Sequence, residues 1–403
     1  MAEQLYDVVV VGGGPAGATA AEHLARAGHA VLLVNREGRI KPCGGAIPPK
    51  AIRDFDIPDS QIVARARAAR IIGPSGHSVD MPVDSGGYVG MVDRDTFDPW
   101  LRERAAAAGA QRLDAVFDSL EQQPDGTVRL HLKPNGRGSG GGAGDGEAIR
   151  VRARMVIGAD GARSQVARQG LPRSKEPRSV FAYHEVVEAP EPSPAYNPIS
   201  CDVIYDGRWS PDFYAWVFPH GDKASIGLGT AHKGFALREA TASLRRHLGL
   251  ENARLVRHEG APIPLKPRKV WDNRRNILLA GDAAGVVAPA SGEGIYYALL
   301  GGQYAAEAVD EALRTGSARA LASARKRFMS QHGRVFFALG LLQAFWYASD
   351  KRREQFVRLC ADPEIQELTW QAYMNKELVK RRKASHLRIF MKDLANLLGL
   401  ARA

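Results

Sequence analysis

The residues of this chain best suited to chemistry stand in three short glycine-containing motifs. They are Gly12–Gly17, Gly158–Ser164 and Gly281–Gly285. In a dinucleotide cradle, such glycines form a tight turn, let the backbone approach a pyrophosphate, and let helix and strand pack closely. A cradle at the start of the chain, followed by acids placed to hold the far half of the same molecule, predicts bound FAD.

The first motif lies between elements that can form a βαβ unit. Asp7–Val11 is a β-branched apolar run typical of a buried parallel strand, and Ala18–Ala27 has helical composition that Gly28 ends. The phosphates are then expected at the helix N-terminus. The residues assigned to cofactor binding here are Gly12, Gly14, Pro15, Ala16 and Gly17.

A second strand is expected at residues 30–34, ending where an acid usually receives the adenine ribose. This chain has Asn35 and Arg36 there, and we assign both to the cofactor. An asparagine side chain can still donate and accept hydrogen bonds, so the departure weakens that contact without removing it.

Two later strand candidates end in an acid. Val151–Gly158 leads to Asp160 and Gly161, and Asn276–Ala280 leads to Gly281 and Asp282. A carboxylate just beyond a parallel strand lies at the ligand crevice of an open α/β sheet. We assign all four residues to the cofactor, with Asp282 accepting hydrogen bonds from the ribityl chain. Each pair taken alone is also an ordinary turn sequence.

Ser291–Ile295 opens a further helix. Its glycines allow backbone N–H groups to approach the pyrimidine end of a flavin, where negative charge grows on reduction. We therefore add Gly292, Gly294 and Ile295 to the cofactor residues.

The ordered motifs resemble the flavoprotein fold of the para-hydroxybenzoate hydroxylase type. Within that fold, Arg39–Gly45 and Tyr214–Pro219, the latter followed by Ile226 and Gly227, are similar to geranylgeranyl reductases. The likeness covers nearly the whole chain and is greatest to the chlorophyll and bacteriochlorophyll branch. It implies an α/β fold with a discontinuous Rossmann-like FAD-binding domain, an antiparallel-sheet substrate domain and a helical C-terminal region.

The resemblance places Cys43, with Gly44 and Gly45, beside the isoalloxazine ring. Cys43 is our candidate for proton delivery or alkene positioning, and the alternative is a small packed thiol. By the same resemblance Arg94 contacts the flavin or its phosphates, and the alternative is a solvated arginine.

Tyr214 and Trp216 lie two residues apart on an expected strand, so they share one face. We assign them to the catalytic pocket as an aromatic wall for a prenyl chain. The alternative is that they form ordinary sheet core.

The resemblance implies FAD-dependent, NADPH-driven reduction of three of the four double bonds of a geranylgeranyl group to phytyl. The substrate is the free diphosphate or a group esterified to (bacterio)chlorophyll. Because the chain has one dinucleotide fingerprint, the nicotinamide donor must visit transiently, or a protein donor such as a ferredoxin replaces it. The rival functions are a flavin monooxygenase of the same fold and a non-catalytic, membrane-associated pigment carrier.

Composition sets further limits. The 403 residues suffice for two domains, and the three cysteines are too few and too scattered for a disulfide frame or a metal site. Acids near the start argue against a signal or transit peptide. We expect a protein on the cytoplasmic side, not secreted, with peripheral contact with a photosynthetic membrane left open.

The net charge of +11 is concentrated at the end of the chain. Residues 376–403 hold eight basic and two acidic side chains, beginning with Lys376, among apolar residues at helical spacing. Such a basic amphipathic helix binds anionic membrane surfaces, and the alternative is a helix docked on the core. No nucleic-acid-binding motif accompanies the charge, so we expect no nucleic-acid partner.

The predicted domain division follows from these elements. The FAD-binding domain takes residues 1–70, 90–175 and 270–330, and the substrate domain takes 71–89 and 176–269. The C-terminal helical region takes 331–403. A Gly-rich segment at 133–147 is expected to be a long hairpin loop.

Overall fold

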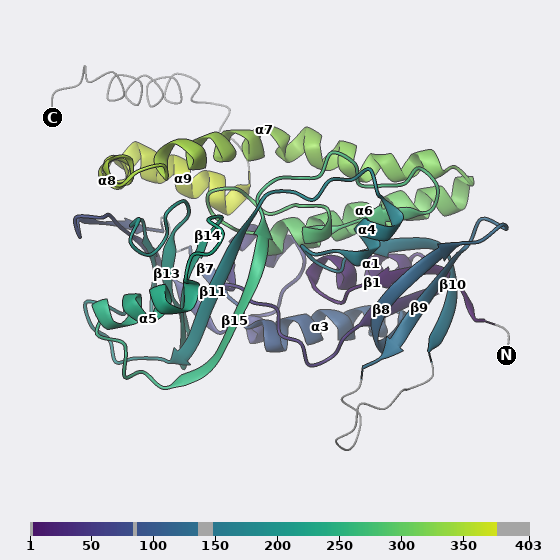
Figure 1. The fold of residues 1–403 in the computed structure, drawn as a ribbon, viewed down its shortest axis with the longest axis horizontal. Coiled ribbons are helices and arrows are strands. Elements are labelled where there is room, and N and C mark those ends of the chain that lie inside the picture. Colours follow the sequence, from purple (N-terminus) through teal and green to yellow (C-terminus); the bar gives the residue numbers. More distant parts are fainter. Residues whose placement is uncertain (1–2, 84–86, 136–147, 377–403) are drawn as a thin grey trace.

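A computed structural model of the chain describes residues 3–83, 87–135 and 148–376. Two β-sheets lie toward opposite ends of the molecule, and a long C-terminal helix runs past both of them (Figure 1). Of the Gly-rich segment 133–147 and the basic segment 376–403, residues 136–147 and 377–403 lie outside the described residues, so the predictions made for them remain predictions.

The first sheet, called the parallel sheet, is built on the N-terminal strand. Strands β8, β2, β1, β10 and β16 lie side by side in that order and run parallel. Strand β9 pairs antiparallel with residues 115–122 of β8 and residues 149–153 of β10. The strand bounds are β1 Leu5–Val11, β2 Val31–Asn35, β8 Gln111–Gln122, β9 Val128–Pro134, β10 Ile149–Gly158 and β16 Ile277–Leu279.

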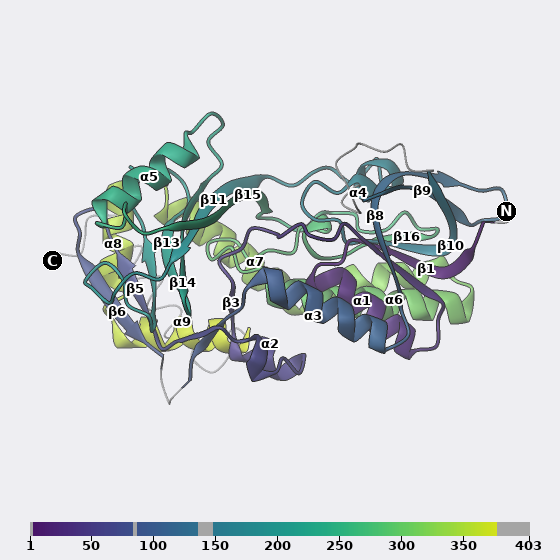
Figure 2. The same cartoon turned by 90° about the horizontal axis from the view of Figure 1, so that it is seen from below.

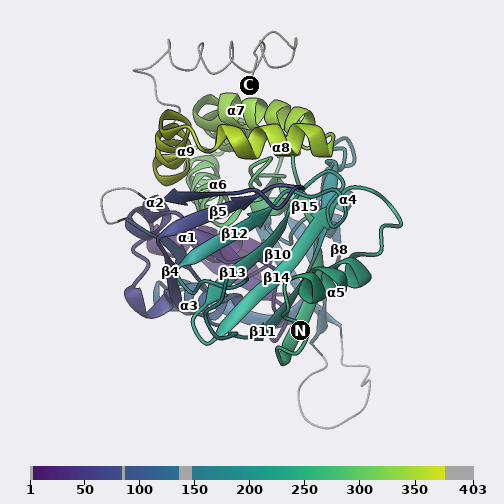
Figure 3. The same ribbon diagram turned by 90° about the vertical axis from the view of Figure 1, so that its left-hand side faces the viewer.

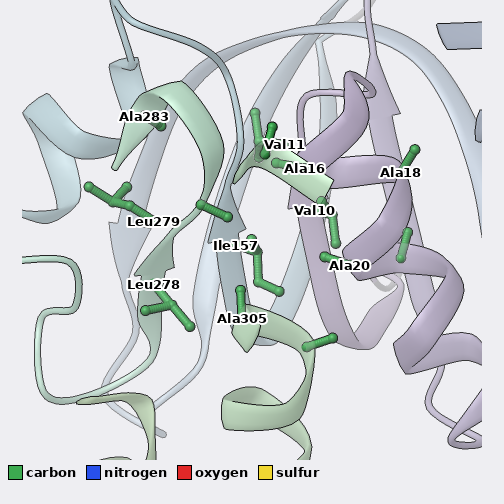
Figure 4. Close-up of a cluster of buried hydrophobic side chains, with 14 of the residues drawn as sticks. Val10, Val11, Ala16, Ala18, Ala20, Ile157, Leu278, Leu279, Ala283 and Ala305 are labelled. Atoms are coloured by element: carbon green, nitrogen blue, oxygen red, sulfur yellow. The ribbon is translucent and has the colours of Figure 1, made fainter. Parts of the chain in front are cut away.

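Helices α1 (Pro15–Arg26), α3 (Arg94–Ala107) and α6 (Ile295–Thr315) lie side by side along this sheet (Figure 2). Small side chains of α1 and α6 face apolar side chains of β1, β10 and β16 in the buried core (Figure 4). The two helices approach so closely that a Cβ on Gly302 would lie 2.2 Å from the Ala16 carbonyl oxygen. Close helix packing therefore fixes the start of α1 against the start of α6.

The second sheet, called the antiparallel sheet, has the strand order β15-β11-β14-β13-β12-β5-β6. Its pairs are antiparallel except β12 with β5. Helix α5 (Leu237–His247) packs on one face. The other face shares a buried cluster with the C-terminal residues Trp346, Val357 and Trp370. The strands are β5 Ala68–Ile72, β6 Ser78–Pro82, β11 Ser179–Glu188, β12 Ser200–Ile204, β13 Ala215–His220, β14 Lys223–Thr230 and β15 Leu255–Pro264.

Short elements connect these two halves. Strands β3 (Ala46–Ile47), β7 (Val89–Met91) and β4 (Ala64–Ala66) form a small antiparallel sheet. The other short elements are α2 Pro49–Asp54, α4 Gln165–Gly170 and the 3₁₀ turns η1 Asp59–Gln61, η3 Gly281–Ala283 and η4 Ala318–Leu321.

Helices α7 (Ala322–Trp346), α8 (Asp350–Leu359) and α9 (Pro363–Asn375) lie together along one side of the molecule (Figure 3). Their inner faces are packed, but α7 exposes Phe337, Leu341 and Leu342, of which Phe337 is 70% exposed. Among the described residues, no helix combines the length and apolar character needed to cross a bilayer.

The observed fold confirms the predicted class: an α/β Rossmann-like unit, an antiparallel sheet and a helical C-terminal region. The exact division into domains stays a prediction. Strands β5 and β6 belong to the antiparallel sheet, although they lie more than 100 residues before most of its strands.

Candidate active site

The fingerprint loop between β1 and α1 is shaped by backbone contacts that exclude side chains. A Cβ on Gly12 would lie 2.3 Å from the Ala159 carbonyl oxygen, and one on Gly17 would lie 1.8 Å from the Gly12 oxygen. At Gly14 the nearest atom to an added Cβ is Arg94 Nη2 at 3.8 Å, so that position borders open space. The loop therefore has the shape of a cradle whose middle glycine borders open space.

The N-terminus of α1 leaves donors free for such a ligand. Gly14 is the N-cap, Pro15 follows at the first helical position, and no described side chain caps the helix. The unpaired N–H groups of a first turn bind phosphate, helped by the helix dipole. The backbone at Ala16 and Gly17 is placed accordingly, so these residues fit a dinucleotide pyrophosphate.

Arg94 is buried beside this cradle and is not a surface residue. Its guanidinium donates to both carboxylate oxygens of Asp98, at 2.6 and 2.7 Å, and it also interacts with the Cys43 thiol. Burial acts to lower the pKa of Arg94, but the Asp98 carboxylate outweighs it and raises the pKa above its ordinary value. A permanent positive charge therefore stands between the phosphate cradle and Cys43.

Asn35, at the end of β2, is engaged with the fingerprint loop itself. Its Oδ1 accepts a hydrogen bond from the Gly13 N–H at 3.0 Å, while Arg36 is exposed. The side-chain NH₂ of Asn35 remains the group that could meet a ribose. The assignment of Asn35 and Arg36 to the cofactor stays a prediction.

Asp160 lies beyond β10, and its carboxylate caps the next helix. Its oxygens accept from Ser164 Oγ at 2.5 Å and from the backbone N–H groups of Gln165 and Val166. Burial raises the pKa of Asp160 despite these bonds. Gly161, at φ +85°, has no atom within 4 Å of an added Cβ. Their contact with the cofactor is still a prediction, made beside a structural role that the structure provides.

Asp282 lies at the start of η3, directly after β16, and its side chain is 8% exposed. It forms an ion pair with Lys41, which belongs to the segment that carries Cys43. The preceding Gly281 has φ +61° and lies against Ala16 of α1. The third motif is therefore joined both to the fingerprint and to the cysteine segment.

The segment before α6 is tied to the antiparallel sheet. The Tyr214 hydroxyl donates to the Ser291 carbonyl oxygen at 2.6 Å, and a Cβ on Gly292 would lie 3.3 Å from that hydroxyl. Gly294 is the N-cap of α6, and Ile295 is buried at its first position. Glu293 accepts from the Tyr296 N–H and forms a buried ion pair with Lys376 at 2.8 Å.

One cavity of about 280 Å³ joins these parts. The predicted residues that line it are Pro15, Cys43, Gly44, Gly45, Arg94, Tyr214, Trp216, Asp282, Gly292, Gly294 and Ile295. The predicted residues that do not line it are Gly12, Gly14, Ala16, Gly17, Asn35, Arg36, Asp160, Gly161 and Gly281. A reacting ring and a substrate could meet among the residues of the first set. The second set lies outside the cavity lining, in the fingerprint loop and α1 and at the ends of β2, β10 and β16.

The wall opposite the cradle is aromatic and alternates as expected. Tyr214, Trp216 and Phe218 belong to the core cluster on the cavity side, while Ala215 and Val217 pack toward α5 on the other face. Trp216 Nε1 donates to Ser225 Oγ at 3.1 Å, which fixes the indole. These side chains are both sheet core and cavity lining, and their contact with a prenyl chain stays a prediction.

Cys43 is the partly exposed cysteine of the three, whereas Cys201 and Cys360 are buried. Its Sγ accepts from the Gly45 N–H at 3.3 Å. Burial raises the pKa of the Cys360 thiol to about 12 and that of Cys201 further above its ordinary value. Cys43 and Cys201 both line the cavity, and of the two Cys43 is the one that lies beside a cation, Arg94.

Several site residues were not singled out by sequence reasoning. Lys41 and Glu293 stand inside quoted motifs, and Phe218 and His220 continue the two-residue alternation of Tyr214 and Trp216. Extending the two-residue period to the end of the strand would have identified Phe218 and His220.

Lys376 requires a correction. The sequence pattern assigns Lys376 to the basic tail, but its side chain is 4% exposed and pairs with Glu293. Its Nζ lies 4.2 Å from the centre of the Tyr373 ring. Its charge therefore belongs to the wall near the cavity and not to a solvated basic surface.

Comparisons with known proteins identify the family of this chain. The chain is 52% identical to a geranylgeranyl diphosphate reductase of Rhodobacter capsulatus over 396 residues, covering 98% of each chain. The chain belongs to the geranylgeranyl reductase family. Other relatives include the geranylgeranyl diphosphate reductase of Synechocystis, at 33% identity over 97% of each chain, and the chloroplastic one of rice, at 34% over 97% of this chain and 86% of that one.

Solved structures and family models extend this assignment. A geranylgeranyl bacteriochlorophyll reductase-like protein from Thermoplasma acidophilum has a TM-score of 0.77 at 25% identity, covering 94% of this chain and 98% of that one. The flavin-dependent brominase Bmp2, at 17% identity and a TM-score of 0.75, shares the fold. A family described as pyridine nucleotide-disulphide oxidoreductase matches residues 6–173, and one described as lycopene cyclase protein matches 231–393. The predicted membership of the geranylgeranyl reductase family is confirmed.

Proposed function

We propose that this chain is an FAD-dependent, NADPH-driven reductase that saturates three double bonds of a geranylgeranyl group stepwise to give phytyl. One observation carries the proposal. A single cavity joins the fingerprint helix at Pro15 to the aromatic wall at Trp216, with Cys43 between them. A flavin held by the cradle would thus share an apolar space with a prenyl chain. The names of the relatives support the same substrate class.

The chain's own residues fit FAD. The cradle at Gly14 borders open space, and the first turn of α1 leaves its N–H groups free for phosphates. Asp282 lines the cavity and is proposed to accept from the ribityl chain. When bound, FAD supplies the hydride chemistry between the nicotinamide and the alkene. The apolar wall excludes water from that exchange.

Alkene reduction also needs a proton on the second carbon, and Tyr214 and Cys43 are two proton-bearing residues that line the cavity. The Tyr214 hydroxyl already donates to the Ser291 carbonyl, and burial raises its pKa above the ordinary value. Tyr214 is therefore proposed as a wall and positioning residue. Cys43, whose Sγ lies in the cavity and accepts from a backbone N–H, is proposed to hold the proton.

The charges along the cavity favour entry of the prenyl chain without its head group. Among the described residues, Lys41 is paired with Asp282, Arg94 with Asp98, and Glu293 with Lys376. A diphosphate inside would compete with these pairs, and removing one partner of a buried pair is costly. We therefore propose that the head group, diphosphate or pigment ester, stays outside the apolar space.

An anaerobic flavin titration tests this function. NADPH should bleach the flavin absorbance of the purified protein, and geranylgeranyl diphosphate should restore it without oxygen. A reduced flavin that oxygen reoxidises but geranylgeranyl diphosphate does not would point to the monooxygenase alternative. A flavin that no donor can bleach would point to a pigment carrier. Reduced ferredoxin, added in parallel, identifies the donor.

Substitution of Cys43 tests its role. Cys43→Ala should retain FAD, because the thiol makes no contact that the cradle needs, and should lose turnover. Cys360→Ala is the matched control, since that thiol is buried and lies outside the cavity lining. Undiminished turnover in Cys43→Ala would remove this residue from the mechanism.

A further inference from the structure

The face of β13 that bears the aromatic wall ends in a buried histidine. His220 lies six residues after Tyr214, and it is 5% exposed. Its ring packs behind the Cys43–Gly45 segment so closely that a Cβ on Gly45 would lie 2.5 Å from His220 Cε1. Neither an apolar wall nor the dinucleotide cradle requires an imidazole there.

The hydrogen bonds of His220 specify its charge. Nδ1 lies 2.8 Å from Asp93 Oδ1, and Nε2 lies 3.1 Å from the Gly44 carbonyl oxygen. A carbonyl oxygen and an ionised carboxylate can only accept, so both ring nitrogens must donate. A ring with two N–H donors is an imidazolium.

Asp93 is ionised in this arrangement. Burial acts to raise the pKa of Asp93, but the hydrogen bond and charge of His220 outweigh it, and the pKa lies below its ordinary value. The other charged groups near it are Lys223 on β14, at 3.7 Å from Asp93 Oδ2, and Arg257 on β15, which is itself paired with Asp95. Arg94 on α3 is neutralised by Asp98.

The segment Val92–Asp93 holds the cysteine segment at two adjacent points. The Val92 N–H donates to the Gly45 carbonyl oxygen at 2.9 Å, and Asp93 holds Gly44 through the histidine ring. Loss of the ring would leave the Gly45 contact in place and free the Gly44 carbonyl, next to Cys43.

We propose that His220 is a positioning residue of the active site, which as an imidazolium bridging Asp93 to the Gly44 carbonyl fixes Cys43 on the cavity wall. The importance of that position rests on the proposed function, but the bridge itself does not. Because the bridge needs two donors, a side chain that cannot supply them should loosen the segment.

Alkylation of Cys43 by iodoacetamide in the FAD-loaded protein, followed by peptide mass spectrometry, measures this loosening. At near-neutral pH, His220→Phe should speed labelling of Cys43 by about tenfold, the factor expected for losing a charge-assisted hydrogen bond. Cys201 and Cys360 are buried and serve as internal references for the global fold. His232→Phe, at an exposed histidine, is the control and should change nothing.

A polar replacement separates positioning from a packing defect. His220→Gln keeps an amide that can donate to the Gly44 carbonyl oxygen and to Asp93, so it should label Cys43 more slowly than His220→Phe. Equal labelling rates in the two variants, or a labelling rate unchanged by His220→Phe, overturns the proposal.

A second variant covers the case in which His220→Phe also exposes Cys201 and Cys360. Asp93→Asn keeps the side-chain size and removes the charge that holds the ring, so it should raise Cys43 labelling alone, to a smaller extent. Unchanged labelling in that variant overturns the bridge. The labelling needs no turnover, so a reductase assay that fails while labelling shifts would contradict only the proposed function.

Discussion

The two walls of the cavity are built by different means. On the cofactor side the shape comes from the backbone: Gly12 and Gly17 exclude any side chain, and a helix N-terminus supplies donors. On the opposite side the shape comes from side chains, with Tyr214, Trp216 and Phe218 packed from one strand face. The first wall tolerates one residue type at each tight point, whereas the second tolerates similar shapes.

This difference explains what a sequence can show. A backbone constraint requires glycine at a fixed spacing, so the fingerprint can be recognised from the sequence alone. A packed wall requires only apolar residues at every second position, a pattern that ordinary sheet core also has. Variants should therefore be most damaging on the cofactor side and graded on the aromatic side.

The largest effect is expected from Gly17→Ala. The added Cβ would lie 1.8 Å from the Gly12 carbonyl oxygen, a contact that backbone atoms cannot relieve by side-chain rotation. The variant should purify without flavin and with reduced thermal stability. Gly340→Ala, where an added Cβ meets nothing within 4 Å, is the control and should behave as the unaltered protein.

Asp282→Ala comes next. If its carboxylate accepts from the ribityl chain, the protein should fold and purify largely colourless, as measured by the ratio of flavin to protein absorbance. Lys41→Met removes the partner of Asp282 while keeping the carboxylate. The account expects more flavin in Lys41→Met than in Asp282→Ala, and a fully yellow Asp282→Ala would contradict it.

Lys376→Met tests the C-terminal end of the side-chain wall. It leaves Glu293, 3% exposed, without its partner, at a cost of roughly 3–5 kcal/mol. The double variant with Glu293→Gln should recover much of that loss in denaturant unfolding. Truncation after Lys376 keeps the ion pair and should cost far less. If that truncation instead costs as much as Lys376→Met, residues 377–403 contribute to the core.

Acid titration sharpens the same region. His332 on α7 is buried, and burial, assisted by Lys376, lowers its pKa from 6.5 to about 4. The unfolded chain then binds more protons than the folded one between these values, so stability should fall as the pH falls through that window, by roughly 3 kcal/mol at most. His332→Phe should flatten this dependence, and an unchanged slope would contradict the assignment.

The smallest effect is expected from Tyr214→Phe, which removes the hydrogen bond to the Ser291 carbonyl. The loss should be about 1 kcal/mol in stability, with retained flavin and a changed KM for the prenyl substrate. A loss of flavin as complete as in Gly17→Ala would show that the two walls do not differ as described.

Much of this fold followed from local pattern. The strands that precede Gly12, Asp160 and Gly281 were predicted because a buried parallel strand and the glycine turn after it are short-range features of the sequence. The alternation from Tyr214 to Phe218 was equally local.

The remainder depends on contacts distant in sequence. That Asp93 meets His220, 127 residues away, and that Lys376 is buried against Glu293, 83 residues away, cannot be derived from periodicity. The basic residues after position 376 made Lys376 resemble its neighbours, although its environment is different. The ion pair of Lys41 with Asp282 was hidden for the same reason, since neither residue's neighbours indicate the other.

The most direct test of the central claim is the mass of the prenyl product. FAD-loaded protein incubated without oxygen with NADPH and geranylgeranyl diphosphate should yield products that gain hydrogens in pairs, in up to three steps. A polyene recovered unchanged while NADPH bleaches the flavin, or a product that gains oxygen when air is admitted, would contradict it.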